Sequence, residues 1–227
     1  MNTPAADITQ LRILQLVSPA LPVGGYAYSQ GLEWAVEAGW VNDEATLADW
    51  LEDQLMHIVA TVDLPLFVRL HQAAAACDEP ALLTWSRTLI ASRETSELVA
   101  DDCDRGRALA RLLDGLGVTA ARPWLERADT PFAAVFAVGA VAWDIPCEQA
   151  ALAYAWGWLD NQVLVGVKLV PLGQLAGQQV LLQLAAKIPD ALAAALGCAD
   201  DDIGGMLPVQ ALASSLHETQ YTRLFRS

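Results

Sequence analysis

The chain has 227 residues, of which 54% are hydrophobic and 18% charged, and it carries a net charge of −14. This length suits one domain, and the apolar fraction is too high for an intrinsically disordered chain. The acidity argues against a nucleic-acid-binding protein, because binding to phosphates requires a basic surface. The 40 alanines and the many leucines favour an all-α fold, since these residues are the best helix formers.

Proline, glycine and capping residues divide the first half of the chain into short predicted helices. The first covers residues 7–17, with the apolar side chains at positions 8, 11 and 14 expected to face the core and Leu16 as a further candidate. Residues 18–25 are predicted to form a loop and residues 30–38 a short helix. Asn42 or Asp43 is expected to cap the next helix, and Asp63, before a proline, to cap another.

The second half continues the helical pattern. A cap is expected at residue 78, and the remaining predicted helices cover residues 94–113, 131–141, 146–170, 171–187, 188–196 and 208–217. The charge-free run 169–186 approaches the length of a membrane span, but its Pro, Gly and Gln residues favour a buried helical segment. We therefore predict one helical-bundle-like domain over residues 1–227, with about ten helices and a tail at 218–227.

The sequence predicts a cytoplasmic protein with reduced thiols. Its first residues lack the basic region of a secretory signal. The four cysteines lie far apart and form no C-x-x-C pair, so they are expected to serve as small apolar residues.

No motif points to a catalytic residue, a bound cofactor or a metal site. The chain has no G-x-x-x-x-G-K-[ST], no G-x-S-x-G and no H-E-x-x-H motif. Its histidines at positions 57, 71 and 217 have no partner at metal-ligand spacing and are expected to be partly exposed on helices.

One enzymatic alternative remains. Asp101 and Asp102 begin a run similar to the D-D-x-x-D motif of all-α enzymes that bind Mg²⁺-diphosphate, but Arg105 stands where the last aspartate should be. A solvated helix face balanced by arginines is the favoured interpretation of these acids.

Three segments have the composition of interaction surfaces. Residues 18–33 combine two prolines, three glycines and two tyrosines, and residues 168–178 combine a lysine with glutamines in apolar surroundings. Residues 217–227 carry Tyr221, Leu224, Phe225 and two arginines, types that are common in protein interfaces. The charge is uneven as well, because residues 1–60 hold eight acids and one base, half of the net charge, whereas the last residues are basic. Such an asymmetry can steer partners.

Four segments in order and spacing resemble the UreF-type urease accessory proteins. They are residues 14–33 (LQLVSPALPVGGYAYSQGLE), 91–98 (ASRETSEL), 167–174 (VKLVPLGQ) and 223–227 (RLFRS). The resemblance extends from about residue 11 to the C-terminus. It departs from the usual pattern at Gly25-Tyr26-Ala27 and at Lys168, where arginine is common; the lysine would not support a role that needs a bidentate guanidinium.

The resemblance implies an all-α, non-enzymatic protein that works in a complex. Members join a UreD-type (also called UreH-type) accessory protein, recruit a UreG-type GTPase and dock on apo-urease during nickel insertion. They form homodimers, and no nucleic-acid or membrane partner is implied. The residues expected to face the GTPase are Pro22, Gly24, Tyr26, Tyr28, Ser29, Glu33 and Lys168. The tail residues expected to contact the UreD-type protein are Tyr221, Arg223, Leu224, Phe225 and Arg226.

Overall fold

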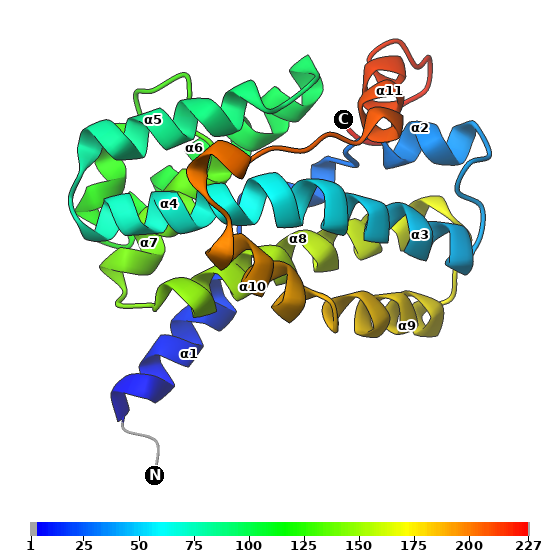
Figure 1. Ribbon diagram of the computed structural model, residues 1–227. Coiled ribbons are helices and arrows are strands. Elements are labelled where there is room, and N and C mark those ends of the chain that lie inside the picture. The colour runs from blue at the N-terminus through cyan, green and yellow to red at the C-terminus, as the bar shows by residue number, and fades with distance from the viewer. Residues whose placement is uncertain (1–3, 227) are drawn as a thin grey trace.

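The computed structural model describes residues 4–226, and this part of the chain is helical and contains no strand (Figure 1). The α-helices are α1 (Pro4–Leu16), α2 (Leu32–Glu37), α3 (Glu44–Gln54), α4 (Leu64–Ala75), α5 (Glu79–Ala91), α6 (Ser96–Gly115), α7 (Phe132–Ala142), α8 (Cys147–Leu169), α9 (Gln174–Ala185), α10 (Ile188–Gly197) and α11 (Pro208–His217). Three short 3₁₀ segments, η1 (Gly25–Ala27), η3 (Thr119–Trp124) and η4 (Asp200–Asp202), and one π-helical segment, η2 (Leu55–Asp63), complete the elements. The predicted all-α fold is confirmed.

The cap predictions at the starts of α3 and α5 are confirmed, and the one at Asp63 is wrong. Asp43 caps α3, with its side chain accepting a hydrogen bond from the Thr46 amide, and Asp78 accepts from the Ala81 amide at the start of α5. Asp63 has helical backbone angles and makes no cap hydrogen bond, because α3, η2 and α4 follow one another without interruption. Its side chain is buried instead.

The centre of the core is a cluster of aromatic rings from α4, α7 and α8. The Phe67 ring stacks on Tyr154 at 5.1 Å between centroids and meets Phe136 edge-on at 5.8 Å. Helix α6 packs against α7. It approaches so closely at Gly106 that a Cβ atom there would lie 1.9 Å from the Thr130 carbonyl oxygen. Glycine is therefore required at this crossing.

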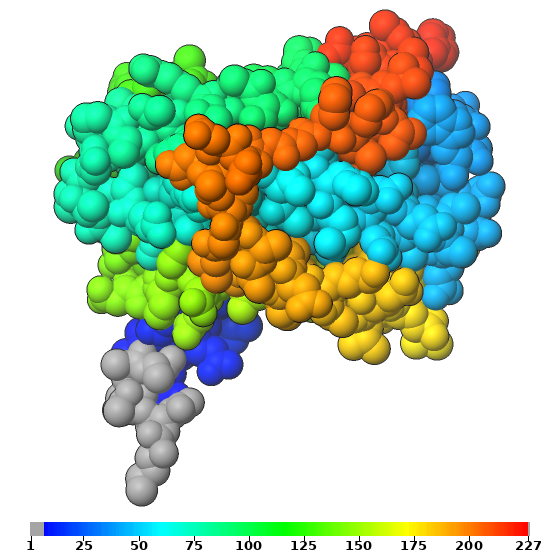
Figure 2. Space-filling view, viewed as in Figure 1, coloured from blue at the N-terminus to red at the C-terminus, as the bar shows by residue number. Residues whose placement is uncertain are grey.

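Helix α1 projects from the body, and its predicted burial is largely wrong (Figures 1 and 2). Ile8, Leu11 and Leu14 are 58%, 64% and 57% exposed, whereas Leu16 is buried. Helical periodicity indicates an apolar stripe, but it does not reveal whether the same chain covers that stripe. The described chain leaves this one uncovered.

The apolar region near the C-terminus, expected to be a buried helical segment, is only partly buried. Residues Gln174–Gly197, which contain α9 and α10, are long and apolar enough to cross a membrane by length and composition alone. Core helices of globular proteins pass the same test, and 39% of the most apolar stretch of this segment is buried against the rest of the chain. We therefore give it no membrane role.

A buried ion cluster joins η2, the α5–α6 connection and α6. The Arg93 guanidinium donates a hydrogen bond of 2.8 Å to Asp102 and forms an ion pair of 2.8 Å with Asp63, and Arg105 pairs with Asp101 at 2.5 Å. All five side chains are 13% exposed or less. The prediction that Asp101 and Asp102 form a solvated helix face is therefore wrong.

Each acid in this cluster has a structural partner. Asp102 also accepts a hydrogen bond of 2.9 Å from the Phe132 amide at the start of α7, and Asp101 accepts one of 2.8 Å from the Gln30 side chain. Burial raises the pKa of Asp63, opposed by the charge of Arg93, and burial likewise raises the pKa of Asp101, opposed by Arg105. Desolvation of these carboxylates thus outweighs the attraction of the arginines.

We expect Arg93→Met to destabilise the fold by about 3–5 kcal/mol, because it leaves two buried carboxylates without their shared cation. Urea denaturation checks this, with Arg87→Met as the matched control, since the Arg87 side chain is 67% exposed. The control should change the free energy of unfolding by less than about 0.5 kcal/mol. Equal stability of the two variants would show that the cluster does not stabilise the fold.

Candidate docking site built from the tail

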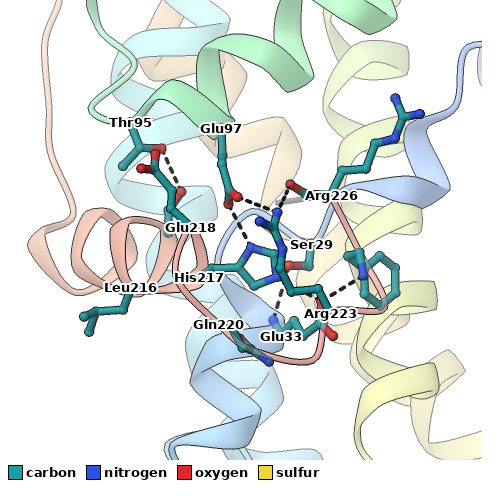
Figure 3. Close-up of polar contacts among 12 residues, drawn as sticks. Ser29, Glu33, Thr95, Glu97, Leu216, His217, Glu218, Gln220, Arg223 and Arg226 are labelled. Atoms are coloured by element: carbon teal, nitrogen blue, oxygen red, sulfur yellow. Dashed lines mark hydrogen bonds and ion pairs between the residues drawn. The ribbon is translucent and has the colours of Figure 1, made fainter.

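The C-terminal residues after α11 fold back onto α2 and α6 (Figure 3). The Phe225 ring is 5% exposed, and the Arg226 amide donates a hydrogen bond of 2.8 Å to the Ala27 carbonyl oxygen in η1. The tail and the Pro/Gly/Tyr-rich segment, which the sequence placed on separate partner surfaces, are therefore neighbours. We call residues 22–33 and 221–226 together the tail–body surface.

Glu33, in the first turn of α2, fixes the tail backbone. Its carboxylate accepts hydrogen bonds from the Leu224 amide at 2.6 Å and the Phe225 amide at 2.9 Å. The Glu33 side chain is buried, and its bond from the Phe225 amide is shielded from water. Glu33 thus holds the tail in place and does not itself offer a contact to a partner.

A glycine next to Glu33 allows α11 to pack against α2. Gly31 has φ +87°, and a Cβ atom there would lie 3.0 Å from the Ser214 amide nitrogen in α11. Both the positive φ and this close approach favour glycine. The packing brings His217, the last residue of α11, next to Glu33.

His217 and Arg223 tie the tail to α6 as well. The His217 ring lies 2.9 Å from Glu33 through Nε2 and 2.8 Å from Glu97 through Nδ1. Arg223 donates to the other oxygen of Glu97 and to the Arg226 carbonyl oxygen. The expectation that the histidines are partly exposed is wrong for His217, which is completely enclosed, and for His71, which is also buried.

A second polar group links η1 to α6 beside the tail. The Tyr28 hydroxyl donates a hydrogen bond of 2.9 Å to Asp104, and the Arg226 guanidinium lies 3.8 Å from the same carboxylate. Burial raises the pKa of Tyr28, which keeps the phenol in its donating form. These residues line an open groove of about 440 Å³ together with Pro22, Gly24, Tyr26 and Arg107.

The predicted site residues fall into two groups in the structure. The exposed ones are Pro22, Tyr26, Tyr221, Leu224, Arg226 and Lys168, and Gly24 is half-buried beside them. The other group supports the tail: Tyr28, Ser29, Glu33 and Phe225 are buried, and Arg223 is in the Glu97 ion pair. Lys168 connects the two groups, since its Nζ atom lies 5.7 Å from the centroid of the Phe225 ring.

Sequence reasoning missed Glu97, Asp104 and His217 as parts of this site. Glu97 lies within the segment 91–98 that carries the family resemblance, and this is the one signal that the sequence offers for it. His217 begins the segment 217–227 that composition selects, but neither it nor Asp104 has a sequence neighbour that indicates its partner. Only the docking of the tail shows their partners.

The geometry does not support the Mg²⁺-diphosphate alternative. Asp63 from a second helical segment does join Asp101 and Asp102, but each of these acids is already ion-paired with Arg93 or Arg105. The cavity beside them holds about 30 Å³, room for one or two water molecules. Among the described residues, no group of three or more His, Cys, Asp or Glu side chains is arranged to hold a metal ion.

Comparisons with known proteins agree with the resemblance seen in the sequence. The UreF family model matches residues 41–185. The urease accessory protein UreF of Alkalilimnicola ehrlichii is 50% identical over 97% of this chain and 96% of its own length. Those of Pseudomonas putida strain W619 (50% identical, 98% of this chain, 99% of the relative) and Pseudomonas entomophila (48%, 100% of both) are similarly close. The chain therefore belongs to the UreF family of urease accessory proteins.

Proposed function

We propose that this chain is a non-catalytic docking subunit for urease maturation. It binds a UreD-type accessory protein and recruits or regulates a UreG-type GTPase for nickel insertion into apo-urease. The observation that carries this proposal is the tail–body surface, where a tail with exposed Tyr221, Leu224 and Arg226 is fixed on a rigid body. Its relatives are named urease accessory proteins, a class that assists an enzyme.

The GTPase is proposed to bind over the groove beside η1. Tyr26 is 65% exposed there, and Arg226 adds a cation at the rim. Exposed Tyr and Arg side chains around a concave surface are typical of interface centres. The UreD-type partner is proposed to bind the outer side of the tail, where Tyr221 makes no burying contact.

The strongly negative net charge of the chain is consistent with a cytoplasmic protein that meets its partners by diffusion. A charge of −14 creates a long-range field that attracts basic surfaces and repels a second copy. The electrostatic repulsion between two copies is therefore lowest when they meet through a face with few charges. Helix α1 carries one acid and one base next to its exposed apolar stripe. We propose α1 as the homodimer surface.

Removal of the tail tests the UreD-type contact. We expect deletion of residues 218–227 to weaken capture of the UreD-type protein about tenfold or more, because it removes the anchoring side chains. Tyr221→Ala in the intact chain should produce part of the loss, since this ring is fully exposed. Calorimetric titration with the purified partner measures both. Unchanged affinity after the deletion would disprove the tail assignment.

Tyr26 tests the GTPase side. We expect Tyr26→Ala to lower the affinity for the GTPase about tenfold, as for an aromatic interface anchor, while circular dichroism stays helical. Leu182→Ala is the matched control, because Leu182 is comparably exposed on α9. Glu33→Ala is unsuitable as a surface probe, since it would also release the tail. Equal binding of the Tyr26 variant and wild type would place the GTPase elsewhere.

Charge reversal of the α1 stripe tests the dimer. We expect the double variant Leu11→Arg, Leu14→Arg to be monomeric where the wild type is dimeric, because four added cations would face one another across the interface. Light scattering after size exclusion gives the mass, and Leu182→Arg serves as the control. A dimer that survives the double variant would assign the interface to another face.

A further inference from the structure

His217 lies between two carboxylates, with no access to water. Its Nε2 and Nδ1 atoms are 2.9 Å and 2.8 Å from oxygens of Glu33 and Glu97, and the ring is 0% exposed. The two acids come from different helices, α2 and α6, and both also bind the tail. The imidazole therefore connects the two acids that hold the tail (Figure 3).

The two contacts of the ring depend on how many of the His217 nitrogens carry a proton. An ionised carboxylate only accepts hydrogen bonds, and a neutral imidazole has one N–H to donate. Two short contacts to two carboxylates therefore need an imidazolium, which donates from both nitrogens. A neutral ring would leave one of the two acids without its donor.

The charges around the ring support the same proton count. The groups that face it or share its partners are Glu33 on α2, Glu97 on α6 and Arg223 in the tail. Glu218, at the end of α11, is exposed and accepts a hydrogen bond from Ser96 instead. With an imidazolium, two anions meet two cations; with a neutral ring, a buried group would carry one uncompensated negative charge, which is costly.

We propose that His217 is a positioning residue that holds the tail–body surface together only in its doubly protonated form. The proposal rests on the proposed function, because the surface that it controls is the one assigned to the partners. Loss of the proton frees one carboxylate and weakens the hold on the Leu224 and Phe225 amides. Tail docking, and with it partner binding, is therefore tighter at acid pH and weakens as the pH rises.

Amide hydrogen exchange in the full-length protein tests this directly. Protection factors of Leu224 and Phe225, which correct for intrinsic exchange rates, are measured in steps between about pH 5.5 and about pH 8.5. In the wild type we expect them to fall about tenfold or more across this range. In His217→Gln, which cannot carry the charge, they should be low throughout and show no pH dependence.

His57→Gln is the matched control, because His57 is exposed on η2 and far from the tail in sequence. It should reproduce the wild-type profile, and circular dichroism should show every variant to be folded. Should His217→Gln fail to fold, the wild-type profile alone decides. High, pH-independent protection in the wild type, or full protection in folded His217→Gln, would overturn the proposal.

Partner binding separates this inference from the proposed function. His217→Gln could release the tail while the UreD-type protein and the GTPase still bind as they bind the wild type. In that case the proposed function of the surface fails and the role of His217 stands. If the tail stays docked in His217→Gln, the role of His217 fails whatever the partners do.

Discussion

The candidate site depends on the carboxylate of Glu33. This buried side chain accepts hydrogen bonds from the backbone amides of Leu224 and Phe225 and contacts the His217 imidazole at the end of α11. Without it, the Phe225 amide, whose hydrogen bond to Glu33 is buried, would have no acceptor, at a cost of about 1–3 kcal/mol. The tail would then detach, and Phe225 would leave its place beside Lys168. A single acid thus determines whether the tail and the body present one surface or two.

Two buried ionic clusters have different consequences for function. The cluster of Asp63, Arg93 and Asp102 joins elements of the body and leaves only a cavity for one or two water molecules. The cluster around His217 joins the body to a terminal segment, which is the part of a chain most easily displaced. The first stabilises the fold, and the second controls whether a surface exists. This difference is why the acids at positions 101 and 102 belong to structure, although their spacing suggests chemistry.

Most of the helices could be predicted from the sequence, because their signals are local. The cap at Asp43 and the bounds of α11 follow from side chains within four residues. Predictions fail where a segment that is distant in the sequence determines whether a side chain is buried. Periodicity places the α1 stripe in the core, but no other described segment covers it. The proline after Asp63 predicts a cap, whereas Arg93, thirty residues away, holds this side chain buried.

The site follows the same rule. Residues of the tail and of the Pro/Gly/Tyr-rich segment could be selected by composition and by family resemblance. Their sorting into exposed and supporting side chains could not be predicted, because the buried Tyr28 differs from the exposed Tyr26 only through what packs on it. His217 has no sequence neighbour that indicates its two carboxylate partners, which lie 184 and 120 residues away.

The central claim is that the fixed tail and the body together form the docking surface for the GTPase. Its most direct test is an exchange footprint of the GTPase on this chain in complex with the UreD-type protein. We expect addition of the GTPase to protect residues 22–28 and 223–226 together and to leave α9 unchanged. Protection of α9, or of only one of the two segments, would contradict it.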